Sequence, residues 1–263
     1  MRRFGATVLA VWLLGLGVRA AEVARPQVWV FAGLAGEAER SERYLATVKR
    51  LQEALRQRFG VADADLRILF ERGVQPFPAC DEGALLRELD AVKQASASGR
   101  PLWLIFVGQG ATGKDEARFH LPGQDVTARQ IGERLAGAAA DSALVVLFTS
   151  AASGAFLEAL AGPNRLLVAA AAPGIEDNET EFPHLLAEVL AQPREADTDG
   201  DGRLAVAELV RAVSTRAEAW YRERGLVNTE RAVIDGNGDG RVDPTPGADD
   251  DRYARTAGLS YQR

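Results

Sequence analysis

The residues best suited to chemistry lie within residues 197–208, a stretch of twelve. Carboxylate side chains stand at its first, third, fifth and twelfth positions, and a glycine stands at the sixth. This spacing is typical of a calcium-binding loop of the EF-hand type, in which oxygen atoms surround the cation and the glycine allows a sharp turn. The predicted ligands are the side chains of Asp197, Asp199, Asp201 and Glu208 and the backbone carbonyl of Arg203.

The charge of this loop favours a bound cation. Four carboxylates within twelve residues repel one another unless a positive ion lies among them. The alternative is a solvated acidic turn that caps a helix predicted over residues 206–224. Pro193 lies four residues before Asp197 and is expected to stop the incoming helix, so the predicted site has only its outgoing helix.

A second loop of the same kind begins at Asp235, 38 residues after the start of the first. Its first nine positions fit the calcium pattern. The predicted ligands are the side chains of Asp235, Asn237 and Asp239 and the carbonyl of Arg241. The twelfth position is Pro246, which has no side-chain oxygen, so Asp243 and the acidic run at 249–251 would have to complete the shell. The alternative is a glycine–aspartate turn that packs beside the first loop.

Hydrophobic periodicity predicts the elements that position these loops. Strands are predicted at 28–31, 66–70, 102–107, 143–148 and 166–171, and helices at 44–59, 81–92, 126–135, 155–160 and 179–190. Several strands are apolar on both faces, as in parallel sheets covered by helices. The predicted fold class is therefore α/β, a mostly parallel sheet with helices on both faces, followed by a small helical calcium-binding region. Sites in such sheets lie beyond the carboxyl ends of the strands.

Two strand ends carry patterns that point to other chemistry. Residues 108–114 follow a strand and match both GxGxxG and GxxxxGK, but Asp115 stands where a phosphate loop needs serine or threonine. The next segment is a poor helix that ends in a turn, so a glycine-rich loop is favoured over a nucleotide site. Ser153 follows a strand, but Ala151 replaces the glycine that a serine-hydrolase elbow requires.

The thiol and the histidines favour structural roles. Cys80 has no basic neighbours, and the adjacent Asp81 and Glu82 disfavour a thiolate. A single cysteine also excludes a disulfide framework within the chain and a cysteine-rich zinc site. No motif ties His120 or His184 to a nucleophile.

Four stretches near the predicted strand ends form a further pattern. They are 106–110 (FVGQG), 148–154 (FTSAASG), 119–127 (FHLPGQDVT) and 174–182 (GIEDNETEF). Their order resembles the legumain-like branch of the caspase-fold cysteine peptidases, over roughly residues 25–190. In that family one strand ends in Gly-His-Gly, whose histidine is the general base, and the next ends at the nucleophilic cysteine, followed by Ser-Gly.

Carried over residue by residue, the resemblance implies that Gln109 occupies the base position and Ala151 the nucleophile position. A glutamine amide does not accept a proton at neutral pH, and an alanine methyl cannot attack a carbonyl. Shifting the second stretch by one residue offers Ser150 or Ala152, and neither is cysteine. The resemblance thus implies the fold of a peptidase without its catalytic pair.

The leading functional hypothesis is an exported, calcium-binding, caspase- or legumain-like protein without peptidase activity. It would act in binding or scaffolding, with a peptide or protein partner at the former substrate groove between Gln109 and Ala151. The alternative is a working hydrolase that uses Ser153 or Ser150 with a non-standard base. A third hypothesis is a purely structural calcium module whose sheet binds nothing.

Charge and the first residues add the remaining expectations. The formal net charge of −6 gives no global electrostatic reason to expect a nucleic-acid partner. Arg2 and Arg3 precede an uncharged, mostly apolar stretch at 5–18, and Ala20 ends a motif typical of signal-peptidase cleavage. A signal peptide over 1–20, export to the periplasm or beyond, and a mature chain without a bilayer span are therefore predicted.

A change of composition after Pro193 predicts the organisation of the mature chain. The predicted parts are an α/β domain over 24–192, a calcium-binding region over 195–250 and a tail over 251–263.

Overall fold

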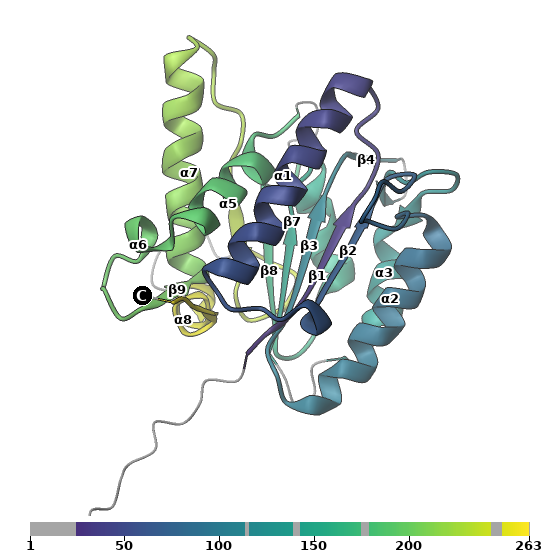
Figure 1. Ribbon diagram of the computed structural model, residues 1–263, viewed down its shortest axis with the longest axis horizontal. Helices are drawn as coiled ribbons and strands as arrows, with labels where there is room; N and C mark the ends of the chain where they lie inside the picture. The colour runs from purple at the N-terminus through teal and green to yellow at the C-terminus, as the bar shows by residue number, and fades with distance from the viewer. Residues whose placement is uncertain (1–24, 114–115, 139–142, 175–178, 243–248, 263) are drawn as a thin grey trace, which may run out of the picture.

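The computed structural model describes residues 25–113, 116–138, 143–174, 179–242 and 249–262 (Figure 1). The signal peptide predicted over residues 1–20 lies outside the described residues. The main feature is a six-stranded, mostly parallel sheet with helices on both faces, so the predicted α/β class is confirmed.

The strand order of the main sheet is β10-β8-β7-β3-β1-β2. Its strands are β1 (Gln27–Ala32), β2 (Leu66–Phe70), β3 (Leu102–Val107), β7 (Leu144–Phe148), β8 (Arg165–Ala169) and β10 (Val233–Asp235). The first five pair in parallel, and β10 runs antiparallel along β8 at one edge. The parallel strands run upward in Figure 1, so their carboxyl ends lie at the top of the sheet.

Aromatic rings fill the layer on one side of the sheet. Phe106 of β3 and Phe148 of β7 stack with ring centroids 4.0 Å apart, and Phe148 also stacks on Phe156 at 4.2 Å. Phe119 meets Phe106 edge-on at 5.5 Å. All residues of β3 and β7 are buried. Because each large apolar side chain contributes roughly 1.5–3 kcal/mol when buried, strands that are apolar on both faces take the centre of the sheet.

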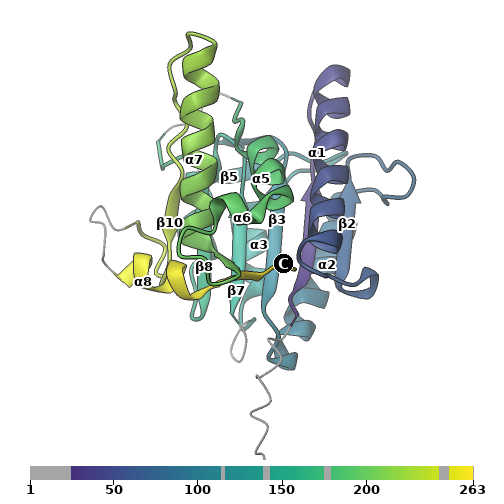
Figure 2. The same cartoon turned by 60° about the vertical axis from the view of Figure 1, so that its left-hand side comes forward.

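Two groups of helices cover the two faces (Figure 2). One group comprises α1 (Ala38–Gln57), α5 (Phe182–Ala191) and α7 (Val206–Glu223), and the other α2 (Glu82–Ala95), α3 (Ala128–Leu135) and α4 (Leu157–Leu160). Short 3₁₀ turns are η1 (Asp63–Asp65), η2 (Ser96–Ser98) and η3 (Ser153–Phe156). Asp81 caps α2, since its Oδ1 accepts a hydrogen bond from Ala84 N at 2.8 Å. Within the described residues, none of the helices combines the length and the apolar character needed to span a bilayer.

A small antiparallel sheet lies between β3 and α3. It consists of β4 (Gly110–Thr112), β5 (Ala117–Phe119) and β6 (Val126–Thr127). The segment expected to be a poor helix is therefore part of a hairpin, and the GxGxxG stretch enters a strand. Helix α3 begins at Ala128 rather than 126, because the Thr127 side chain accepts a hydrogen bond from Gln130 N at 3.1 Å and caps the helix there.

The C-terminal region completes the main sheet and its core. Strand β10 is an edge strand of that sheet, and α7 packs against α5. Leu209 and Val213 of α7 belong to the same buried cluster as Val48 and Leu51 of α1. Although the sequence predicts a boundary between 192 and 195, both sides of it contribute to one core. The reason is the apolar face of α7, which is buried largely by packing on α5 and α8.

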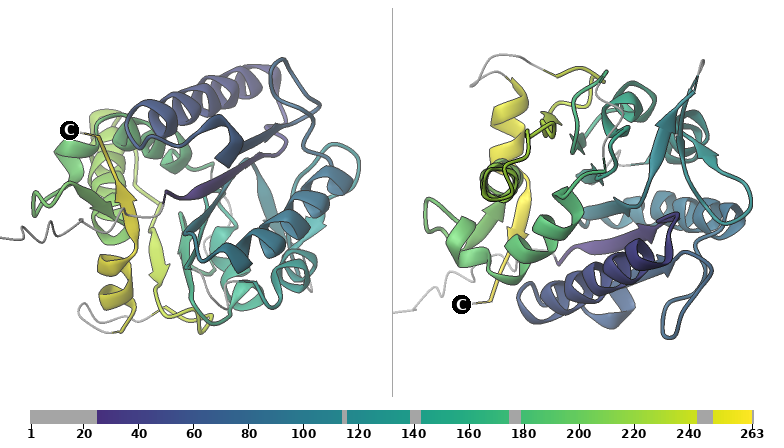
Figure 3. Two further views of the ribbon diagram at one scale, coloured as in Figure 1. Left: turned by 60° about the horizontal axis from the view of Figure 1, so that its bottom comes forward. Right: turned by 90° about the horizontal axis from the view of Figure 1, so that it is seen from above.

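The last residues are structured where a tail is predicted. They form α8 (Asp249–Thr256) and β11 (Gly258–Ser260), which lie beside α7 in Figure 3. Strand β11 pairs antiparallel with β9 (Arg203–Ala205). This pairing explains why the last residues are structured. Without a second strand beside it, β9 would leave backbone N–H and C=O groups unpaired.

Candidate functional site

The first predicted calcium loop connects α6 (Pro193–Ala196) to α7. Helix α5 ends at Ala191, before Pro193, as the proline predicts. Contrary to expectation, a one-turn helix still precedes the loop, because Pro193 stands at the first position of α6, where its missing N–H costs nothing.

Asp197 at the first position organises the turn of the loop. Its Oδ1 accepts a hydrogen bond from Gly200 N at 2.7 Å, and its Oδ2 accepts one from Gly202 N at 3.0 Å. Gly200 and Gly202 have φ values of 74° and 88°, a region that favours glycine. The two glycines therefore let the chain wrap around the Asp197 carboxylate.

The next two acidic residues repeat this arrangement at shorter range. Asp199 Oδ1 accepts a hydrogen bond from Asp201 N at 3.1 Å, and Asp201 Oδ1 accepts one from Arg203 N at 2.7 Å. These bonds fix the backbone from the third to the seventh position of the loop. The Arg203 carbonyl, predicted as a ligand, belongs to the first residue of β9.

Glu208 closes the loop from the first turn of α7 and is buried. Its Oε1 accepts hydrogen bonds from both Thr198 N and Thr198 Oγ1 at 2.7 Å, and its Oε2 accepts one from Ala205 N at 3.1 Å. One carboxylate thus joins the beginning of the loop, its end and the start of the outgoing helix.

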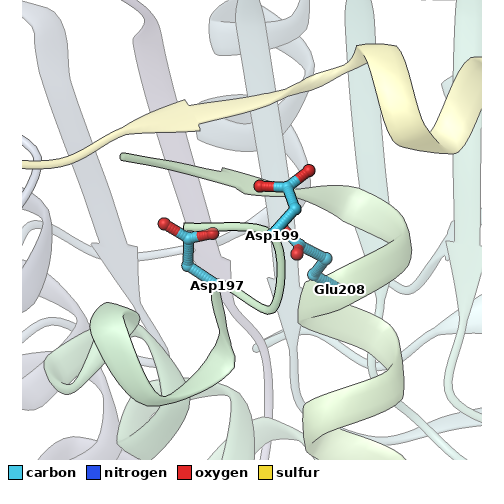
Figure 4. A group of neighbouring side chains, drawn as sticks. All are labelled: Asp197, Asp199 and Glu208. Atoms are coloured by element: carbon cyan, nitrogen blue, oxygen red, sulfur yellow. The ribbon is translucent and has the colours of Figure 1, made fainter. Parts of the chain in front are cut away.

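Three of the predicted ligands converge (Figure 4). Carboxylate oxygens of Asp197, Asp199 and Glu208 lie within 4.8 Å of one another. Asp201 is not part of this group. Three negative charges at this separation repel one another, and oxygen donors of this kind suit a hard cation such as Ca²⁺. The residues present therefore fit a metal ion at this position.

The pKa values of Asp197 and Glu208 show that the loop favours the ionised carboxylate of each. Burial alone would raise the pKa of Asp197, but hydrogen bonds from the Tyr261 hydroxyl, Gly202 N and Gly200 N lower it below its ordinary value. For Glu208, burial again opposes ionisation, but the hydrogen bonds from Thr198 and Ala205 lower the pKa. Both side chains are therefore anionic at neutral pH.

The C-terminal strand forms the outer wall of this loop. Ser260 of β11 pairs with Arg203, and the Tyr261 hydroxyl donates a hydrogen bond to Asp197 Oδ2 at 2.7 Å. Sequence reasoning missed this partner of Asp197, because 64 residues separate the two. The aromatic residue near the C-terminus was the available signal, but nothing local connects it to the loop.

The second loop has the same internal hydrogen bonds. Asp235 is fully buried, and its carboxylate accepts hydrogen bonds from Gly238 N and Gly240 N, both at 2.7 Å. Asn237 Oδ1 accepts one from Asp239 N at 2.9 Å, and Asp239 Oδ1 one from Arg241 N at 2.8 Å.

The second loop packs beside α4. Gly162 N donates a hydrogen bond to Gly238 O at 2.8 Å, and a side chain at Gly240 would meet Glu158. Asp243, which is predicted to help complete the shell, lies outside the described residues, and so do the side chains of the predicted acidic run at 249–251. The structure thus fixes the first half of this loop and leaves its calcium ligation a prediction.

The two positions singled out by the peptidase resemblance share one cavity. Gln109 and Ala151 follow β3 and β7 at the carboxyl ends of the sheet and line a cavity of about 290 Å³. Its wall also includes Arg40 and Glu179, which form an ion pair with a 2.9 Å separation between Arg40 Nε and Glu179 Oε2. The cavity lies where binding sites of α/β sheets are found.

The two serines weighed as nucleophiles lie in different surroundings. Ser153 is completely buried, and its Oγ accepts a hydrogen bond from Ala171 N at 3.0 Å. Ser150 lines the cavity but is only 3% exposed, and its Oγ has no hydrogen-bond partner among the described residues. The Ser150 side chain lies against Gly110.

The two histidines differ in their surroundings, and the cysteine is buried. His120 lines the same cavity, and its Nδ1 lies 2.9 Å from Asp125 Oδ2. His184 is buried, with Nδ1 2.5 Å from Thr47 Oγ1, and burial together with nearby arginines lowers its pKa to about 3. Burial also raises the pKa of the Cys80 thiol, which keeps it protonated.

Comparisons with known proteins leave the family open. No protein-family model matches this chain, and no curated protein matches it. The legumain-like resemblance therefore stays a prediction.

Proposed function

We propose that this protein binds calcium through residues 197–208 and is an exported, caspase- or legumain-like protein without peptidase activity that acts in binding or scaffolding. The observation that carries the proposal is the convergence of Asp197, Asp199 and Glu208, whose carboxylate oxygens lie within 4.8 Å of one another. An EF-hand-type loop that has only a one-turn incoming helix would supply the site.

The loop geometry supports a cation over a simple helix cap. A cap needs one acceptor for the free N–H groups at the start of α7. Here Glu208 takes that role, while Asp197 and Asp199 bring two further charges to the same point. Without a cation, only the hydrogen bonds that these carboxylates accept within the loop offset their mutual repulsion. A calcium ion among them would neutralise it, and this is why we favour calcium over a helix cap.

The proposal that the protein lacks peptidase activity rests on the cavity at the carboxyl ends of the parallel strands. Its support is the common location of Gln109 and Ala151, which offer neither a base nor a nucleophile. The Arg40–Glu179 ion pair gives this cavity both charges, a suitable surface for a peptide or protein partner.

Thermal unfolding in EDTA and in millimolar calcium tests the calcium proposal. At a calcium concentration about 100 times the dissociation constant, the folded state should gain about 2.7 kcal/mol, which corresponds to a rise of several degrees in Tm. Glu208→Gln should remove most of this gain, because it deletes one charge and one ligand oxygen. Magnesium should stabilise the protein much less, since it prefers a tighter octahedral shell.

Glu218→Gln is the matched control, because Glu218 is an exposed acid on the same helix outside the loop. It should keep the full calcium response. Equal Tm values in EDTA and calcium, together with no heat of binding by calorimetry, would overturn the calcium proposal and leave the loop as a helix cap.

A further inference from the structure

The cavity at the carboxyl ends of β3 and β7 collects hydrogen-bonding side chains from three elements. Ser150 follows β7, Gln109 follows β3, and Tyr44 belongs to α1. Gly110 also lines the cavity, and a Cβ atom at its position would lie 3.2 Å from Ser150 Oγ. The absence of a side chain at Gly110 therefore keeps the space beside the Ser150 hydroxyl open.

The uncharged polar groups of this cavity are not used by the fold. Ser150 is 3% exposed, and its Oγ has no hydrogen-bond partner among the described residues. The Tyr44 hydroxyl and the Gln109 side-chain amide likewise form no hydrogen bond with the described residues. Buried polar groups in folded proteins are normally paired, and each one that is not requires an explanation.

The charged groups of the same cavity are already paired. Arg40 Nε lies 2.9 Å from Glu179 Oε2, and His120 Nδ1 lies 2.9 Å from Asp125 Oδ2. Burial and the nearby Glu179 carboxylate raise the pKa of Tyr44, so its hydroxyl stays protonated at neutral pH. What the cavity offers a ligand is therefore a set of uncharged donors and acceptors, not a charge.

We propose that this cavity binds an uncharged sugar ring. A sugar hydroxyl both donates and accepts hydrogen bonds, which matches the hydroxyls of Ser150 and Tyr44 and the amide of Gln109. One ring carries several hydroxyls in different directions, so it can pair with groups on different walls, whereas one polar side chain of a peptide offers a single group. The volume of about 290 Å³ lies at the lower limit of small-molecule sites, which suits a single ring.

This inference rests on the proposed function in one respect, that the cavity binds its ligand and does not cleave it. It does not depend on calcium, because none of the acidic-loop residues lines this cavity within the part of the chain that the structure describes. The ring can be a free sugar or the terminal unit of a glycan on a partner, and the chemistry of recognition is the same for both.

Titration of the purified protein in EDTA, followed by saturation-transfer NMR, tests the site. The probes are D-glucose, D-galactose, D-mannose and N-acetyl-D-glucosamine. We expect saturable binding of at least one of them and no binding of cyclohexanol, which has a ring of similar size but a single hydroxyl. The methyl glycoside of the bound sugar distinguishes the two sources: it should bind equally well if the ligand is the end of a glycan and more weakly if it is a free sugar.

Two variants locate the binding. Ser150→Ala should weaken sugar binding about two- to tenfold and leave Tm unchanged, because the hydroxyl that it removes has no partner within the described part of the protein. Gln109→Leu keeps the size of the side chain and should weaken binding to a similar extent; it decides the matter if Ser150→Ala does not fold. Ser98→Ala, at an exposed serine, is the matched control and should bind as the wild type does.

Several outcomes would overturn the sugar proposal. They are no saturable binding of any of the sugars, equal binding of cyclohexanol, and unchanged sugar affinity in both Ser150→Ala and Gln109→Leu. Binding of a capped Ala-Asn-Ala peptide that Ser150→Ala weakens, without sugar binding, would overturn it in favour of a peptide and leave the proposed function in place. Fluorophosphonate labelling of Ser150 would instead overturn the binding role of the cavity itself.

Discussion

At the scale of single residues, the hydrogen bonds of a buried side-chain oxygen decide whether that group keeps a charge for binding or has a purely structural role. Glu208 accepts hydrogen bonds from Thr198 and Ala205 and still contributes to the acidic group of the first loop. Ser153 uses its hydroxyl oxygen to accept the N–H of Ala171. The two residues differ in consequence: the Glu208 carboxylate remains negatively charged, whereas the buried Ser153 hydroxyl already has a structural role.

The serine position gives a test at this scale. Ser153→Ala should lower the free energy of unfolding by about 1–3 kcal/mol, because it leaves the buried Ala171 N–H without an acceptor. Urea unfolding measures this loss, and Ser98→Ala, at an exposed serine, is the control.

The wild-type protein should neither cleave Asn- or Asp-containing peptides nor react with a fluorophosphonate probe. Labelling that Ser153→Ala or Ser150→Ala abolishes would instead favour the hydrolase alternative.

At the scale of elements, a partly buried network of hydrogen bonds holds the start of α5 in place. Glu230 follows α7, and its carboxylate accepts hydrogen bonds from Glu181 N at 2.6 Å, Phe182 N at 3.0 Å and the Tyr221 hydroxyl at 2.7 Å. Glu181 also forms an ion pair with Arg43 of α1. The network therefore connects α1, α5 and the end of α7 on one face of the sheet.

The titration of Glu230 should be visible in the stability of the protein. Burial raises its pKa above the ordinary value despite the hydrogen bonds that it accepts. Its protonated form is therefore favoured by folding, so its contribution to stability is greatest below the unfolded pKa of about 4.3 and declines as the pH rises through the folded-state pKa.

Glu230→Gln removes this titration. The free energy of unfolding of the wild type, relative to that of the variant, should therefore be larger at pH 5 than at pH 7. Urea unfolding at the two pH values measures the difference. Glu223→Gln, at an exposed acid near the end of α7, should show no such pH dependence. A difference that is constant with pH would contradict the raised pKa.

At the scale of the whole molecule, the two ends of the sheet differ in character. The carboxyl end has the cavity with Gln109 and Ala151, and the amino end has a second cavity beside the C-terminal segment. One hydrophobic cluster extends from α1 through α5 to α7 and on to Leu204 and Leu259. The first acidic loop is thereby attached to the core of the main sheet.

This shared core predicts one cooperative unfolding transition. Residues 24–192 and 195–250 should unfold together, because β10 belongs to the main sheet and α7 is buried against α5. Differential scanning calorimetry should give a single peak whose calorimetric and van't Hoff enthalpies agree. Calcium should shift that whole peak. Two separated transitions, with only one of them responding to calcium, would show that the regions fold independently.

The sequence by itself determined the layered α/β fold and the internal geometry of the acidic loops. Both depend on short-range rules: apolar runs alternate with helical spacing, and Asp–Gly patterns of fixed spacing wrap a chain around a carboxylate. The strands at 102–107 and 66–70 are accordingly found with the predicted bounds. The cap of α2 by Asp81 is local in the same sense.

Only the tertiary structure decided which distant segments meet. The pairing of β11 with β9, the Tyr261–Asp197 hydrogen bond and the place of β10 at the edge of the main sheet join residues tens of positions apart. Short strands of three residues have almost no periodicity to detect. Their partners are chosen by which backbone groups and apolar faces remain to be covered once the central sheet has formed, and that depends on the assembled core.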